Sequence, residues 1–218
     1  MKSGWFWGTS LWYDYLKAYA VTRPECLHEW KTSPLGGGQN FIRKMNITYV
    51  ETTHYTQVID LHAHKWSDIR KSYRGLINNA KRQYSFATYD FLGIGIYKKL
   101  HIAANDGQVR SDETYLHQER WLTQGCGMLM LCTDWPACYA GAYWVVYEGN
   151  AYYMSGPSIL HDVQHAVIWE SLQWLKKHGV RLVELGQIDG ETDKEKNIGI
   201  FKQGFGGRAE PFTVVRQR

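Results

Sequence analysis

Three strand-like segments in close succession, followed by one long helical segment, constrain the fold of this chain more than any other feature. The three segments, which short turns connect, span residues 127–133, 137–147 and 151–155. A helix with an apolar stripe is then predicted from Ser158, its expected N-cap, to His178, with Gly179 as its stop. A short apolar strand over residues 180–185 follows. Hairpin turns give antiparallel pairs and a helical crossover gives a parallel pair, so the sequence predicts a mixed sheet with helices on both faces.

The rest of the chain adds helices and strands on either side of this run. Ser67 is the expected N-cap of an amphipathic helix that reaches about residue 84 and has a basic flank. The other predicted helices span residues 90–104, 112–123 and 194–203, and the other predicted strands span residues 49–61, 84–88 and 209–216. Near the N-terminus, the aromatic residues 5–21 indicate a strand or a hairpin, whereas the proline and glycines of residues 32–39 indicate a loop.

The composition limits the kind of partner and the compartment. Hydrophobic residues make up 44% of the 218 residues and charged residues 21%, as in a globular protein. The net charge is only +4, but the basic residues cluster, which favours partners that carry phosphate groups. The four cysteines lack zinc-binding spacing, and the His161–His165 pair lacks the glutamate of a zinc protease, so we expect no metal. Without a signal segment or a run long enough to span a bilayer, we expect a reduced, cytoplasmic protein.

Three further segments carry a family pattern. Residues 66–82 form a basic helix that begins Trp-Ser-Asp-Ile-Arg-Lys, and residues 110–115 read Arg-Ser-Asp-Glu-Thr-Tyr, with Gln118 after them. Residues 184–189 read Glu-Leu-Gly-Gln-Ile-Asp, and residues 199–207 read Gly-Ile-Phe-Lys-Gln-Gly-Phe-Gly-Gly. Over about residues 56–216 this pattern resembles the Fem-type (FemAB/FemX-like) aminoacyl-tRNA-dependent transferases of the GNAT superfamily of acyl-CoA N-acyltransferases.

The resemblance implies a GNAT-like α/β (α+β) fold, with a mixed, mainly antiparallel central sheet flanked by helices on both faces. We expect one such domain over residues 1–218, in which residues 1–55 are an extension that completes or decorates the sheet and residues 56–216 are the Fem-like core. Many Fem proteins have two GNAT domains and a coiled-coil arm, for which this chain has no room. The glycine pair expected after the penultimate strand is Gly186-Gln187 here. These departures bear on whether the acceptor is the cell-wall acceptor of the classical family members more than on the transfer chemistry.

The implied activity is transfer of an aminoacyl group from aminoacyl-tRNA to an amine, such as that of a cell-surface precursor or a sugar nucleotide. No cofactor is expected beyond the tRNA co-substrate. An activated ester needs no covalent nucleophile, but the tetrahedral oxyanion must be stabilised. The resemblance points to Lys202 as the catalytic cation near the reacting carbonyl or the terminal phosphate of the donor. It places Phe201 on the donor side, although the spacing of Phe201 from Phe205 also suits a core position.

Basic residues on the first long helix are the candidates for binding phosphate groups. Arg70, Lys71 and Arg74 would bind the phosphates of the donor or of a nucleotide-linked acceptor. The alternative is that they form a solvated basic face.

The candidates for binding the acceptor are Arg110, Glu113, Tyr115 and Asp189. Glu113 also suits the positive end of the helix that begins there. No single residue stands out as the general base. Asp106, Glu113 and Asp189 are candidates, and so are a substrate group and water.

Two other functions remain as alternatives. An ordinary GNAT enzyme would use acyl-CoA and hold its pyrophosphate on a glycine loop at the N-terminus of the long helix. Here residues 153–160 lack that glycine pattern, and Pro157 has no N–H to donate. The basic helix and the aromatic residues also suit a nucleic-acid-binding or nucleobase-modifying protein, such as one encoded by a phage. Binding of that kind would weaken steeply with salt.

Overall fold

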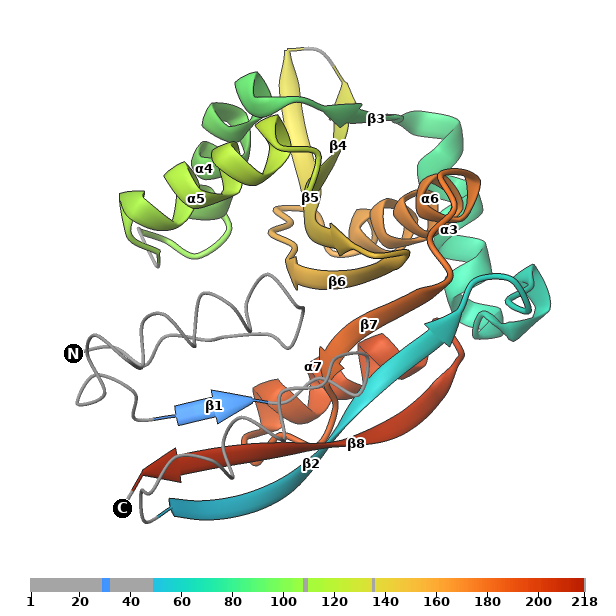
Figure 1. The fold of residues 1–218 in the computed structure, drawn as a ribbon. Coiled ribbons are helices and arrows are strands. Elements are labelled where there is room, and N and C mark those ends of the chain that lie inside the picture. The colour runs from blue at the N-terminus through green and yellow to red at the C-terminus, as the bar shows by residue number, and fades with distance from the viewer. Residues whose placement is uncertain (1–28, 32–48, 108–109, 135, 218) are drawn as a thin grey trace. The chain divides into compact units, whose positions relative to one another are not determined.

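A computed structural model describes residues 29–31, 49–107, 110–134 and 136–217 of the chain (Figure 1). The chain divides into two compact units. The larger unit comprises Val58–Gly186 and Phe201–Gly207, and the smaller unit takes the described residues within Met1–Gln57, Gln187–Ile200 and Arg208–Arg218. Three elements contribute residues to both units, namely β2 (Tyr49–Asp60), β7 (Leu182–Gln187) and α7 (Asp193–Gln203).

The sheet of the larger unit has the strand order β2-β7-β6-β5-β4-β3. The strands not yet given are β3 (Ser85–Tyr89), β4 (Gly127–Asp134), β5 (Ala137–Tyr147) and β6 (Asn150–Ser155). Strands β3 to β6 pair antiparallel in succession, and β6 pairs parallel with β7. The predicted hairpins followed by a parallel crossover are therefore confirmed, and so is the mixed, mainly antiparallel sheet.

Helices cover both faces of this sheet (Figure 1). Helices α3 (Lys71–Gln83) and α6 (Val163–Lys177) lie against one face, and α4 (Ile94–Ala103) and α5 (Asp112–Thr123) lie against the other. Side chains along β4 alternate between the two, because Met130 belongs to the α3/α6 core and Leu129 and Leu131 belong to the α4/α5 core. The predicted arrangement of helices on both faces is confirmed.

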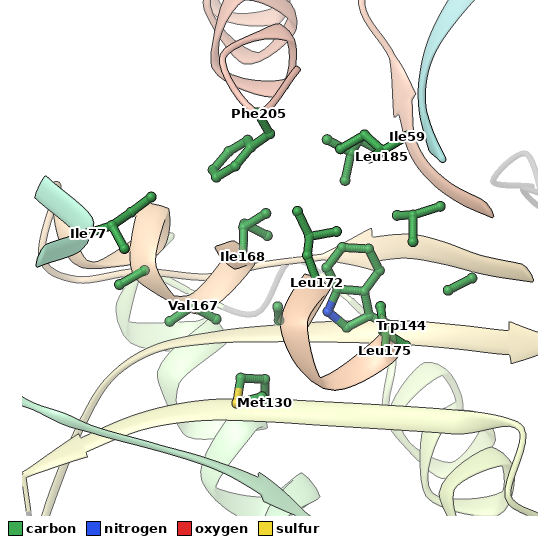
Figure 2. Close-up of a cluster of buried hydrophobic side chains, with 14 of the residues drawn as sticks. Ile59, Ile77, Met130, Trp144, Val167, Ile168, Leu172, Leu175, Leu185 and Phe205 are labelled. Atoms are coloured by element: carbon green, nitrogen blue, oxygen red, sulfur yellow. The ribbon is translucent and has the colours of Figure 1, made fainter. Parts of the chain in front are cut away.

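The core under α6 anchors the segment that follows α7. Figure 2 shows Leu172 and Leu175 of α6 beside Trp144 of β5, with Phe205 in the same cluster. All four side chains are fully buried, and each such burial is worth roughly 1.5–3 kcal/mol. Because Phe205 lies three residues after Lys202, this core holds the end of α7 that carries Lys202.

Helix α6 begins at Val163, five residues after the predicted N-cap Ser158. The intervening chain pairs with β5 instead of turning into a helix. The Gly141 N–H donates to the Pro157 carbonyl at 3.0 Å, and the Ile159 N–H donates to the Tyr139 carbonyl at 2.9 Å. The prediction for Ser158 was wrong because residues 157–159 pair with β5, and α6 begins only after this pairing ends.

The prediction of Ser67 as an N-cap was also wrong. Ser67 lies inside the 3-10 turn η2 (Trp66–Asp68), and the chain then becomes extended at the buried Ile69. Arg70 is the N-cap of α3, and its N–H donates to the Gly204 carbonyl at 2.8 Å. A similar 3-10 turn, η3 (Phe91–Gly93), precedes α4. The predicted boundaries of α5 are confirmed at both ends.

In the smaller unit, β1 (Glu29–Lys31) pairs antiparallel with β8 (Arg208–Gln217), which lies next to β2. The Ile188 N–H donates to the Tyr55 carbonyl at 2.9 Å. The predictions for residues 5–21 and 32–39 lie outside the described residues. None of the helices in the described ranges is both long and apolar enough to cross a lipid bilayer.

Candidate active site

Lys202 and Tyr152 converge on Gly186, the residue at which β7 leaves the larger unit. Lys202 is half-buried on the last turn of α7, and Tyr152 is buried on β6. A Cβ atom built on Gly186 would lie 2.9 Å from Tyr152 Oη and 3.1 Å from Lys202 Nζ. Gly186 also has φ of +85°, a conformation that favours glycine. Because Gly186 has no side chain, the Lys202 amine and the Tyr152 hydroxyl can both approach its Cα atom.

Burial, and after it the neighbouring Glu184 carboxyl group, favours the protonated form of the Tyr152 hydroxyl. Tyr152 and Glu184 are neighbours in the register of β6 and β7, and Glu184 is only 2% exposed. Burial raises the pKa of Tyr152 well above its ordinary value, and the Glu184 carboxylate raises it further. Tyr152 is therefore an O–H donor beside the Lys202 amine. Two such donors can stabilise an oxygen atom on which negative charge develops.

Phe201 belongs to an aromatic cluster with Tyr73, His165 and Phe205. Its ring centroid lies 5.0 Å from that of His165, 5.2 Å from that of Phe205 and 6.1 Å from that of Tyr73. Burial lowers the pKa of His165, whose Nδ1 lies 3.2 Å from the Asp162 carbonyl oxygen. His165 therefore packs as a neutral side chain, and no metal-binding cluster is found among the described residues.

Of the three basic candidates on or beside α3, Arg70 is the one in contact with this aromatic cluster. Its guanidinium carbon lies 5.1 Å from the centroid of the Tyr73 ring, and its Nη1 donates to Tyr73 Oη at 3.4 Å. Lys71 is exposed and Arg74 is half-buried on the following turn. The structure thus brings Arg70 and Phe201 to one cluster, through Tyr73.

Arg110 and Tyr115 also lie together, around a histidine that the sequence analysis did not single out. Arg110 Nε donates to His101 Nε2 at 3.4 Å, and the His101 ring is edge-on to Tyr115 with centroids 6.3 Å apart. Glu113 is 80% exposed and pairs with His117 at 3.6 Å, so it does not join this group. A signal for His101 was its spacing of four residues from Tyr97, which puts both on one face of α4.

Burial and the Arg110 cation keep His101 neutral. His101 is 6% exposed, and its pKa is lowered to about 4, first by burial and then by Arg110. Burial raises the pKa values of Tyr115, Tyr152 and Tyr153, and the Arg110 cation offsets part of each rise. The guanidinium therefore acts electrostatically on tyrosines of β6 as well as on His101.

Asp189, the remaining acceptor candidate, belongs to the smaller unit. Its Oδ2 lies 3.1 Å from His54 Nδ1, and Gln187 Nε2 lies at the same distance from that nitrogen. The Asp189 carboxylate can only accept and the Gln187 Nε2 group can only donate, so His54 Nδ1 can form a hydrogen bond with one of them at a time.

Neither protein-family models nor curated proteins match this chain, but solved structures do. The C-terminal domain of a putative lysylphosphatidylglycerol synthetase from Agrobacterium fabrum matches with a TM-score of 0.64 at 12% identity, over 98% of this chain and 77% of that one. FemX matches with a TM-score of 0.63 at 12% identity, over 93% of this chain and 76% of that one. L-PGS from Bacillus licheniformis matches with a TM-score of 0.64 at 11% identity, over 95% of this chain and 72% of that one.

These identities are low, so the matches bear on the fold alone. The mixed sheet, the helices on both faces and the similarity to FemX agree with the expectation drawn from the sequence motifs. The chain has the Fem-like GNAT fold.

Proposed function

We propose that this protein is an acyltransferase that moves an aminoacyl group from aminoacyl-tRNA to an acceptor amine. The observation that carries the proposal is the convergence of Lys202 Nζ and Tyr152 Oη on Gly186. It occurs at the motif that resembles the Fem-type ending, in a chain with the fold of FemX. We place the reaction in the cytoplasm, where charged tRNA is made.

The chemistry needs an oxyanion stabiliser and a neutral amine. The acceptor nitrogen attacks the ester carbonyl, a C–N bond forms, and the carbonyl oxygen becomes an oxyanion. The Lys202 ammonium and the Tyr152 O–H would stabilise this charge. When the intermediate collapses, the bond to the tRNA oxygen breaks, and the proton lost by the amine ends on that oxygen. No other reactant is required.

The remaining candidates take the roles expected from the sequence. Arg70, Lys71 and Arg74 would bind phosphates of the tRNA, with Arg70 nearest to the Phe201 cluster. Arg110 and Tyr115 would bind the acceptor on the α4/α5 side, while Glu113 and Asp189 stay predictions for the acceptor.

The turn before α6 disfavours acyl-CoA as the donor. The Pro157 carbonyl and the Ile159 N–H are both bonded to β5, and Pro157 has no N–H. The backbone amides that would cradle a pyrophosphate are therefore not all free at this turn.

A lipid hydroxyl is tested beside the amines, because transfer to it would contradict an amine acceptor. One of the similar structures is named for lysylphosphatidylglycerol, in which a lysyl group is joined to a lipid. We would incubate the purified protein with tRNAs carrying labelled amino acids and, separately, with labelled acetyl-CoA. The acceptors would be sugar nucleotides, cell-wall precursors, DNA and phosphatidylglycerol vesicles.

We expect label to move from tRNA to one of these acceptors. Lys202→Ala should lower the rate by about 10²- to 10³-fold, as loss of one oxyanion donor does. Lys196→Ala is the matched control, because Lys196 is a 61% exposed lysine on the same helix. Transfer from acetyl-CoA alone would make the protein an ordinary GNAT enzyme. Salt-sensitive binding to nucleic acid without any transfer would favour a binding protein instead.

A further inference from the structure

We propose that His101, Tyr115 and Arg110 form a binding site for an anionic oxygen group, a carboxylate or a phosphate, on the acceptor. The site lies on the α4/α5 side of the larger unit. Its assignment to the acceptor rests on the proposed function, whereas the binding of the anion does not.

The hydrogen bond from Arg110 fixes the tautomer of His101. A guanidinium has only donors, so the contact from Arg110 Nε makes His101 Nε2 an acceptor. In a neutral ring the single proton must then be on Nδ1. That nitrogen is buried and has no hydrogen-bond partner among the described residues. His101 thus presents an N–H donor with nothing to donate to.

Tyr115 presents a second such group. Its side chain is 3% exposed, and its Oη also lacks a partner within the described part of the chain. Burial raises the pKa of Tyr115, so the hydroxyl keeps its proton. Gln118, one turn further along the same face of α5, has no partner for either amide atom among the residues that the structure describes, so it can add a donor or an acceptor.

The charges around these groups favour an anion. The Arg110 guanidinium is close enough to shift the pKa values of both His101 and Tyr115. The Lys98 ammonium lies 5.7 Å from the centroid of the Tyr115 ring. Asp112, the nearest carboxylate partner, is bonded to Lys98 at 2.9 Å. A buried donor that lacks an acceptor costs free energy, and an anionic oxygen would satisfy two such donors beside a cation.

The test measures binding without any transfer reaction. Inorganic phosphate and acetate are titrated separately into the full chain at constant ionic strength, and the ¹⁵N shifts of the His101 ring are followed. We expect one of the two anions to shift the Nδ1 signal saturably, and the anion that binds more tightly identifies phosphate or carboxylate as the natural group. Nε2 should stay unprotonated throughout.

Arg110→Ala should raise the Kd for that anion by about 10- to 100-fold, the usual effect of losing a charged hydrogen-bond partner. Tyr115→Phe, which removes only the hydroxyl, should raise it by about 2- to 10-fold. Arg120→Ala is the matched control. Arg120 is an exposed arginine on α5, so this substitution removes the same charge at a different place. Its Kd should change by less than about 2-fold.

Two results would overturn the proposal. One is the absence of a saturable His101 shift with either anion, which would leave the donors to ordered water. The other is an equal loss of affinity in Arg110→Ala and Arg120→Ala, which would reduce the effect to net charge. Saturable binding in a protein that transfers no acyl group would contradict the proposed function and leave the anion site standing.

Discussion

The two faces of the larger unit's sheet are built differently. On the α3/α6 face, buried polar groups are mostly bonded to the main chain: His64 Nε2 lies 2.7 Å from the Phe205 carbonyl, and Ser171 Oγ donates to the Val167 carbonyl at 2.7 Å. Within the described residues, Trp144 Nε1 and Gln164 Oε1 are exceptions, and Glu170 Oε1 has only its ion pair with Lys81 Nζ at 2.6 Å. On the α4/α5 face, the core is smaller, and three buried side chains have polar atoms without a partner in the described part of the chain, those of His101, Tyr115 and Gln118.

This difference indicates a division of labour. A buried polar atom without a partner costs about 1–3 kcal/mol, so apolar residues at those positions would make the fold more stable. Sequences depart from the most stable choice chiefly at functional sites. Together with the proposed anion site, this assigns the α3/α6 face to holding the fold and the α4/α5 face to binding at a cost in stability.

The largest effect that tests this contrast is on the α3/α6 side. Leu172→Ala removes a fully buried side chain that contacts the Trp144 cluster (Figure 2). It should lower the free energy of unfolding by about 2–5 kcal/mol, because the lost contacts add to the cavity left behind. Urea unfolding measures this change, and anion binding at His101 should persist in the folded fraction.

Leu116→Ala on α5 is the control, since Leu116 is 53% exposed. Its effect should stay within about 0.5 kcal/mol. If Leu172→Ala cost no more than this control, the α3/α6 core would not be the part that holds the fold.

The next effect is a pH dependence that comes from the other face. The pKa of His101 is about 4 in the folded chain, against 6.5 when unfolded. The unfolded state therefore binds more protons between these values. The resulting stability is fully present above pH 6.5 and is lost as the pH falls to about 4, by up to about 3 kcal/mol. His64 and His165, whose pKa values burial also lowers, act in the same direction.

Unfolding of the wild type and of His101→Asn at pH 7.5, 6, 5 and 4.5 isolates this contribution. The wild type should lose more stability than the variant across this range. His117→Asn changes a half-exposed histidine on α5 and should follow the wild type. Parallel curves for wild type and His101→Asn would mean that His101 titrates normally in the folded chain.

The elements that the sequence predicted best are those with local signals at both ends. Helix α5 has Asp112 and Glu113 at its start and Gly125, in the left-handed region, just after its end. The start of α6 could not be predicted in this way, because residues 157–159 pair with β5, which lies earlier in the chain. A cap signal such as that of Ser158 carries no information about such pairing.

The candidate site shows the same limit. A family motif pointed to Lys202, but its neighbour Tyr152 lies fifty residues earlier and meets it only through the glycine at the end of β7. Likewise, Arg110 and Tyr115 came from one short motif, whereas His101 lies on the preceding helix. Its neutral state follows from burial and from the Arg110 contact, which are tertiary properties.

A smaller effect extends the comparison to β7, where the Lys202 side chain meets the sheet. Gly186→Ala places a methyl group against Tyr152 Oη and Lys202 Nζ, in a conformation with φ of +85°. The strain should cost about 1–2 kcal/mol, and the displaced amine should lower kcat further. Gly75→Ala is the control, because nothing lies within 4 Å of its added Cβ on α3. That change should leave kcat unchanged and raise stability by about 0.5–1 kcal/mol. A normal kcat in Gly186→Ala would contradict the role given to the pair.

The smallest effect compares two tyrosines on the α4/α5 side. Tyr143 Oη donates to the Gln118 carbonyl at 2.7 Å, whereas Tyr115 Oη has no partner within the described residues. Tyr143→Phe should therefore lower the free energy of unfolding by about 1 kcal/mol, and Tyr115→Phe should leave it unchanged or raise it by up to about 1 kcal/mol. Thermal unfolding measured without phosphate or carboxylate in the buffer decides between them. Equal losses in the two variants would mean that the Tyr115 hydroxyl is already satisfied in the free protein. If Tyr115→Phe raised the free energy of unfolding and also weakened anion binding, the Tyr115 hydroxyl would be shown to serve ligand binding while it destabilises the fold.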